Sequence, residues 1–136
     1  KADGYTPPAY WEKIQPITEA LKINVIANGE IWNNADAKAC LQQSNCQDIM
    51  IGRGTVTTPD LTLCIRENND NPVLSWQDLV ELQQRFLSGQ FKTEIGMIGR
   101  YKQWLGMMTK AYPEAQELWT KVKKEKQLEL ILQYLK

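Results

Sequence analysis

The sequence contains no histidine, and this absence removes the side chain most often used as a general base near neutral pH. Ser-His and Cys-His catalytic pairs are excluded with it. The three cysteines, Cys40, Cys46 and Cys64, form no CxxC pair and have no histidine to join in a metal site. They predict reduced thiols of a cytoplasmic protein, with no bound metal.

Long apolar runs and an excess of either charge are also missing. No stretch approaches the ~20 apolar residues of a membrane-spanning helix, and no basic-then-apolar leader opens the chain. We therefore expect a soluble protein without membrane contact. The 16 basic and 16 acidic residues balance. However, residues 1–72 hold 6 Lys/Arg against 9 Asp/Glu, whereas residues 73–136 hold 10 against 7, so the second half is mildly basic.

Two short runs in the first half are continuously apolar and rich in β-branched residues. They are Ile23–Ala27 and Ile49–Ile51. Both are too short for a helix and lack the polar alternation of a half-exposed strand. They predict strands that are buried on both faces, as in a parallel sheet.

Helical patterns surround these two runs. Apolar residues recur at helical spacing over residues 11–21, where Pro16 is expected to interrupt or kink the helix. Asn34 is expected to cap a helix over residues 35–43, and a further helix is expected between residues 58 and 65. The order helix, strand, helix, strand, helix is typical of an α/β fold with a parallel sheet.

Each predicted strand is followed by a small motif built on glycine: Asn28-Gly29-Glu30 and Gly52-Arg53-Gly54. Ligands of parallel α/β folds bind at the carboxyl ends of the strands, and in barrels the loops after the last two strands commonly hold a phosphate. Glycine lets the backbone approach an anion closely, and Arg53 adds a charged fork. Either motif alone is a weak predictor, and a tight turn that merely ends a strand is the alternative.

The second half predicts a separate all-α unit. Residues 68–72 form a polar linker, after which Ser75 is expected to cap a helix that ends at Leu87. A second helix is expected over about residues 93–111, and a third stretch begins at Pro113. Their apolar stripes indicate a small helical bundle. Basic residues lie outside these stripes, and a solvated face is the ordinary interpretation of such a pattern.

The paired glycine motifs resemble the closing strands of the tRNA-dihydrouridine synthases. The segment NVIANGEIWNNADAKACLQQSNCQDIMIGRG is similar to that family's PVIxNGDI…DA…GxDxxMIGRG pattern, with Glu30 in place of Asp and Asn24 in place of Pro. The opening KADGYTPPAYWEKI resembles the segment after the sixth barrel strand, and IGRYKQWLGMMTKAYPEAQ resembles the bacterial C subfamily. The resemblance covers nearly the whole chain.

The resemblance implies the last strand and helix units of a TIM (β/α)8 barrel, residues 1–72, followed by a C-terminal helical tRNA-binding domain, residues 73–136. A complete barrel typically needs ~250 residues. The family's catalytic cysteine lies in the first half of its barrel, and no cysteine here occupies a matching motif. We therefore expect a C-terminal portion of the enzyme that has no catalytic residue and is inactive alone.

The resemblance also implies the chemistry of the whole enzyme, which would reduce a D-loop uridine of tRNA, expected to be uridine 16, with NADPH as reductant and FMN as cofactor. The residues expected to hold the phosphate and ribityl end of FMN are Asn28, Gly29, Glu30, Gly52 and Arg53. The residues expected to contact tRNA are Arg100, Lys102 and Lys123. Two alternatives are a stand-alone tRNA-binding helical module without activity, and another FMN barrel, which leaves residues 73–136 unexplained.

Overall fold

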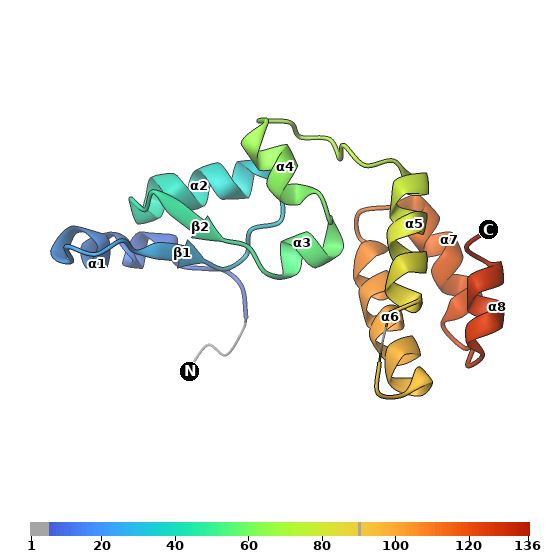
Figure 1. Cartoon of the computed structure of the whole chain (residues 1–136). Helices are drawn as coiled ribbons and strands as arrows, with labels where there is room; N and C mark the ends of the chain where they lie inside the picture. The colour runs from blue at the N-terminus through green and yellow to red at the C-terminus, as the bar shows by residue number, and fades with distance from the viewer. Residues whose placement is uncertain (1–5, 90) are drawn as a thin grey trace. The chain divides into compact units, whose positions relative to one another are not determined.

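The computed structural model describes residues 6–89 and 91–136 and divides into two compact units, residues 1–72 and 73–136 (Figure 1). Each unit has a hydrophobic core of its own. Among the described residues, no helix is long and apolar enough to cross a membrane.

Within residues 6–72, the first unit pairs two short parallel strands, with Ala27 opposite Ile49. The helix between them packs against both strands and completes a β-α-β unit. The parallel pairing predicted from the sequence is confirmed. The elements are a 3-10 turn at Trp11–Lys13, α1 (Gln15–Ala20), β1 (Ile26–Asn28), α2 (Asn34–Ser44), β2 (Asp48–Met50), α3 (Arg53–Thr57) and α4 (Leu61–Arg66).

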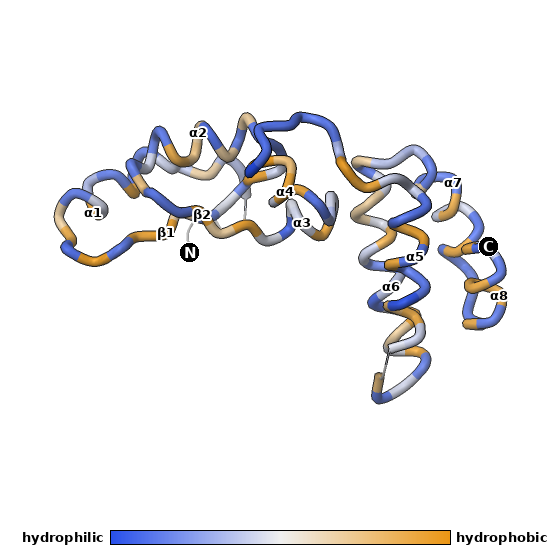
Figure 2. The backbone as a smooth tube through the Cα atoms, turned by 45° about the horizontal axis from the view of Figure 1, so that its top comes forward, coloured by the Kyte–Doolittle hydropathy of each residue, from blue (hydrophilic) through white to orange (hydrophobic). Residues whose placement is uncertain are grey.

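The prediction that both strands are buried on both faces is wrong for the described residues. Ala27 is fully buried and Ile49 is half-buried, but Ile26 is 57% exposed and Met50 is 55% exposed. The reason is that α2 packs on the sheet, whereas the side chains of Ile26 and Met50 lie outside the core of this unit. The hydropathy of the backbone trace shows the apolar segment at β1 (Figure 2).

Three helix starts in the first unit differ from the sequence-based expectation. Pro16 lies in the first turn of α1 and does not interrupt it, because a separate 3-10 turn precedes that helix. The N-cap of α2 is Asn33, whose side chain accepts the Asp36 N–H at 2.8 Å. Gly52 and Arg53 begin α3, a short helix that the sequence did not predict.

Asn34 was expected to cap α2, but its side chain is buried and forms tertiary hydrogen bonds instead. Its side-chain amide donates to Oδ1 of Asn68 at 3.0 Å and to Oδ1 of Asp70 at 3.1 Å. Both acceptors belong to the polar segment predicted as a linker. The first helical turn of α2 therefore anchors that segment.

The described residues of the second unit, 73–89 and 91–136, form four helices around one core: α5 (Trp76–Leu87), α6 (Glu94–Met108), α7 (Pro113–Val122) and α8 (Leu128–Gln133). The helix predicted from Ser75 to Leu87 is confirmed, and Ser75 forms a reciprocal capping box with Asp78. Hydrogen bonds from Ser75 lower the pKa of Asp78. Inside the core, the Tyr101 hydroxyl donates to Gln83 Oε1 at 2.9 Å.

Candidate functional site

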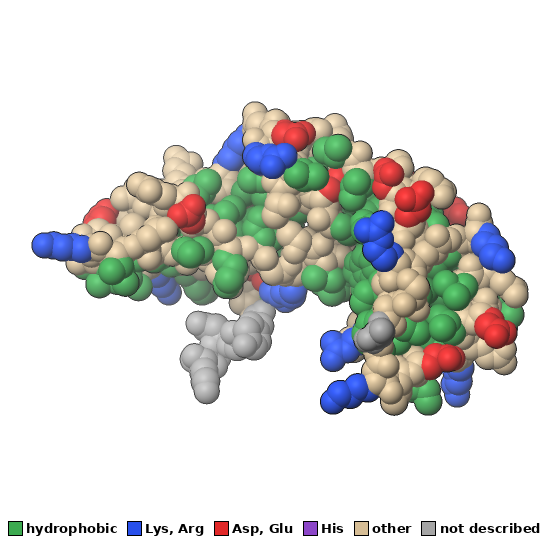
Figure 3. Space-filling view, viewed as in Figure 1, with side chains coloured by type: hydrophobic (Ala, Val, Ile, Leu, Met, Phe, Trp, Pro, Cys, Tyr) green, Lys and Arg blue, Asp and Glu red, His purple; other side chains and the backbone are tan. Residues whose placement is uncertain are grey.

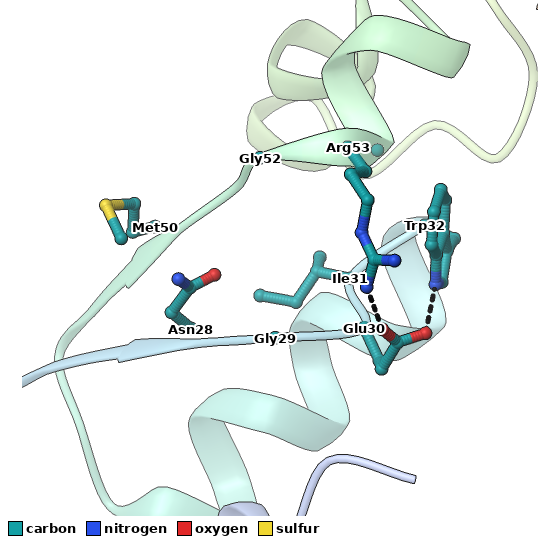
Figure 4. A pocket seen from close by; sticks show the side chains of 9 residues that line it. Asn28, Gly29, Glu30, Ile31, Trp32, Met50, Gly52 and Arg53 are labelled. Atoms are coloured by element: carbon teal, nitrogen blue, oxygen red, sulfur yellow. Dashed lines mark hydrogen bonds and ion pairs between the residues drawn. The ribbon is translucent and has the colours of Figure 1, made fainter. Parts of the chain in front are cut away.

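A cavity of about 550 Å³ lies at the carboxyl ends of β1 and β2 (Figure 4). Both glycine motifs reach it, since each directly follows a strand and the strands are parallel neighbours. All five residues that the sequence assigned to this site line it, and four further residues join them. The complete lining is Asn28, Gly29, Glu30, Ile31, Trp32, Met50, Gly52, Arg53 and Gly54.

Gly29 turns the chain away from β1 with a φ of +116°, a backbone conformation that side-chain-bearing residues rarely adopt. Its carbonyl oxygen accepts the indole N–H of Trp11 at 2.9 Å. The 3-10 turn that carries Trp11 thus holds the first glycine loop in place. Glu30 follows with a φ of 52°, so the chain turns sharply at these two residues, directly after the end of β1 at Asn28.

The two glycines of the second motif have different roles. A Cβ added at Gly54 would collide with the carbonyl oxygen of Ile31 and would lie 2.8 Å from a methyl of Leu61. Gly54 therefore permits close packing of α3 on the first loop. A Cβ at Gly52 would meet no atom within 4 Å, so the backbone there borders open space. Gly52 is the position where a bound group can approach the main chain.

Glu30 and Arg53 form an ion pair that joins the two motifs (Figure 4). The other carboxylate oxygen of Glu30 accepts the indole N–H of Trp32 at 3.0 Å. The Arg53 guanidinium lies 5.4 Å from the Trp32 ring centre, within cation–π range. The Arg53 side chain is still 55% exposed, so it retains accessible surface for an anion.

Trp32 is a site residue that the sequence analysis missed. Its backbone N–H donates to Asp36 Oδ2 at 3.0 Å, which fixes the tryptophan relative to the first turn of α2. An aromatic residue two positions after a glycine motif was the available indication. Its contact with Arg53, however, depends on the pairing of the two strands.

The three cysteines do not line this cavity. All are buried, and burial together with the neighbouring Cys46 raises the pKa of the Cys40 thiol. Because none of them reaches the cavity, none can donate a proton to a ligand there. The described lining therefore offers backbone N–H groups, an amide, one carboxylate and one guanidinium, a set that suits binding and orientation of an anionic ligand.

The basic residues of the second unit do not form one group. The Lys102 ammonium donates hydrogen bonds to the backbone carbonyl oxygens of Lys123, at 3.1 Å, and Glu125. It thereby pairs with carbonyl groups at the C-terminal end of α7. This contact brings Lys102 close to Lys123. Arg100 leaves α6 about 200° around the helix axis from Lys102, and it lines a different cavity together with Lys92.

Comparison with known proteins identifies the family of the chain. Residues 1–134 match the family described as dihydrouridine synthase (Dus). The chain belongs to the dihydrouridine synthase family. This family's barrel architecture explains the parallel β1-α2-β2 unit.

The chain is similar to several bacterial proteins of this family that are named tRNA-dihydrouridine(16) synthase. It is 45% identical to that of Shewanella oneidensis, over 99% of the chain and 43% of the relative. It is 41% identical to that of Pseudomonas putida, over 92% of the chain and 40% of the relative. For the protein from Haemophilus influenzae the identity is 37%, over 90% of the chain and 40% of the relative. The chain thus spans about two fifths of the length of these family members.

Proposed function

We propose that the chain belongs to a cytoplasmic flavoenzyme that reduces a D-loop uridine of tRNA, expected to be uridine 16, to 5,6-dihydrouridine. The observation that carries this proposal is the convergence of both glycine motifs on one cavity at the ends of β1 and β2. The names of the relatives give the substrate, tRNA, and the position, uridine 16. The alternative, a stand-alone tRNA-binding module, does not explain why both glycine motifs line this cavity.

The cavity has the features needed to hold the phosphate and ribityl end of FMN. The open space beside Gly52 lets phosphate oxygens reach main-chain N–H groups, and the exposed guanidinium of Arg53 supplies the opposite charge. Asn28 and Gly29 line the same space from β1. Glu30 orients Arg53 through their ion pair and so acts as a positioning residue.

The chemistry that FMN supplies when bound is hydride transfer, with NADPH as the source of the electrons. The residues of this chain would bind and orient the cofactor. Proton donation to the uracil ring would come from a cysteine outside this chain, as the resemblance to the family implies, and the three cysteines of this chain are buried. By itself, the chain should bind FMN weakly and form no dihydrouridine.

The second unit is the proposed tRNA-binding part, through Arg100, Lys102 and Lys123. Its excess of 10 Lys/Arg over 7 Asp/Glu suits a polyanion. Lys123 is exposed, and Lys102 holds the end of α7 at which Lys123 lies. Recognition of folded tRNA depends on shape and phosphate contacts, so a small number of fixed cations fits this role.

The experiment that tests the proposed function uses a full-length protein containing this chain, because the chain spans only 40–43% of its relatives. Unmodified tRNA is incubated with NADPH, and its nucleosides are analysed by mass spectrometry. Dihydrouridine should appear at position 16. Arg53→Ala should lower FMN content and activity, whereas Arg66→Ala, which removes an exposed guanidinium paired with Glu67, should not. Wild-type protein that binds no FMN and forms no dihydrouridine would refute the proposal.

A further inference from the structure

A second cavity, of about 560 Å³, lies within the helical unit where α5 ends and α6 begins. Its volume falls in the range of ordinary small-molecule sites, about 300–1,000 Å³. We call it the aromatic-cationic pocket, and its lining residues are Phe86, Phe91, Lys92, Thr93, Gly96 and Arg100. Only Arg100 among them was singled out from the sequence.

One side of the aromatic-cationic pocket is built from aromatic rings. The Phe86 ring lies 5.2 Å from that of Phe91 and 5.5 Å from that of Trp104, and both pairs are tilted by 59°. Phe86 and Trp104 pack against the core of the unit, whereas Phe91 remains 37% exposed. The Phe91 ring is thus supported from behind by a fixed neighbour and accessible to a ligand in the pocket.

The other side of the pocket carries two cations, Lys92 and Arg100. Within residues 6–89 and 91–136, neither side chain forms an ion pair, although Glu94 is nearby in the sequence. Some of the lysine and arginine side chains of this unit are visible in Figure 3, among them side chains beside the lower end of α6. Gly96, one turn before Arg100, has no side chain that could fill the space between the two cations.

We propose that the aromatic-cationic pocket binds one nucleotide of an unpaired tRNA segment, with its base against Phe91 and its phosphate between Lys92 and Arg100. This inference rests on the proposed function for its choice of RNA. Single-stranded nucleic acid is bound by cations along the backbone together with an aromatic face for the base, which is the combination found here. A bare anion would not require the ring, and an apolar peptide would not require two cations. Lys92 thereby becomes an RNA contact, and Arg100 acts with it rather than with Lys102 and Lys123.

The charge part of the proposal is tested with the full 136-residue chain and an unmodified tRNA transcript, by filter binding across a salt series. The double variant Lys92→Ala, Arg100→Ala should weaken binding about tenfold, and the slope of log K against log salt should fall by about one. The control double variant Lys38→Ala, Lys124→Ala also removes two exposed lysine charges and should change binding less than twofold. Equal losses from both double variants would overturn the proposal.

The base contact is tested separately with Phe91→Leu, which keeps apolar volume but removes the aromatic face. Binding should weaken about fivefold while the salt slope stays unchanged, because stacking involves no counterion release. Circular dichroism should show the same helix content for every variant. Unchanged affinity of Phe91→Leu, or displacement of tRNA by polyglutamate at equal charge concentration, would refute nucleotide binding. Dihydrouridine formation by the full-length protein is a separate measurement, so failure here leaves the test of the proposed function intact.

Discussion

The two units differ in how much of their apolar surface they bury by themselves. The core of the first unit consists mainly of the small side chains of Ala27, Ala37, Cys40 and Cys46, together with the larger Ile31. In the part of the second unit that the structure describes, the core has fourteen buried residues and includes large ones such as Leu79, Tyr101 and Met108. Since burial of a large apolar side chain contributes about 1.5–3 kcal/mol, the second unit has far more stabilisation of its own.

The first unit instead leaves large apolar side chains exposed on and around its strands, and apolar side chains are visible on its surface in Figure 3. Those with exposed side chains include Ile17, Leu21, Ile23, Ile26 and Met50. A two-stranded sheet also has unpaired edges in the described part of the chain. The glycine-lined cavity therefore belongs to the unit that depends more on further packing partners to bury its apolar side chains. The helical unit has a core large enough for an independent domain.

The largest effect should come from separating the two units. Residues 73–136 alone should fold cooperatively and remain monomeric, because their core is complete. Residues 1–72 alone should lack a cooperative transition and should self-associate through exposed strands. Urea unfolding followed by circular dichroism, together with analytical ultracentrifugation, measures both properties. A monomeric, cooperatively unfolding first unit would contradict the comparison.

A matched pair of core and strand substitutions tests the same comparison within the intact chain. Leu105→Ala removes a fully buried side chain of α6 and should destabilise the second unit by about 2–5 kcal/mol. Ile26→Ala removes the same number of carbon atoms from β1, but its effect should stay within about 0.5 kcal/mol because the side chain is mostly exposed. Hydrogen exchange of α6 and α2 amides reports each unit separately. Equal losses in protection would show that Ile26 is covered in solution.

The sequence predicted the helical unit better than the first unit, for local reasons. Ser75 and Asp78 form a complete capping box within four residues, so the start of α5 was readable from sequence. At α2 two successive asparagines compete, and the contacts of Asn34 with Asn68 and Asp70 make Asn33 the cap. The exposure of the strand residues could not be predicted, because the apolar composition of a strand does not show which other elements pack over it.

The candidate site shows the same division between local and tertiary information. The spacing of the glycine motifs placed Gly29 and Gly52 at neighbouring strand ends, and both line the cavity. The Glu30–Arg53 ion pair joins residues that are 23 positions apart in the sequence. The contact of Lys102 with the end of α7 joins residues 21 positions apart. No local sequence pattern encodes either contact. Sequence thus identified five of the nine residues that line the cavity, whereas the other four and the contacts among them required the fold.

A glycine pair distinguishes packing from binding in the first unit. Gly54→Ala should destabilise this unit by about 3 kcal/mol, because its methyl would collide with the Ile31 carbonyl and little room exists for relaxation. Gly52→Ala should leave stability within about 0.5 kcal/mol, since its methyl enters open space. Hydrogen exchange of α2 amides gives both values. A larger loss from Gly52→Ala than from Gly54→Ala would contradict these assignments.

The smallest predicted effect concerns pH and the buried polar pair of the second unit. Burial raises the pKa of Tyr101 above its ordinary value, so the folded state retains the phenol proton after the unfolded chain has begun to lose it. This stabilisation is complete below about pH 10 and is lost as pH rises, by about 1.4 kcal/mol per unit. The variant Tyr101→Phe, Gln83→Leu removes both hydrogen-bond partners, so no buried polar group is left unpaired. Its urea midpoint should decline less than that of the wild type between pH 9 and 11, a window of about one unit on each side of the ordinary tyrosine pKa. Tyr134→Phe, at an exposed position of the same unit, should keep the wild-type decline. If all three proteins lose stability equally over this range, ionisation of Tyr101 does not limit the alkaline stability of the helical unit.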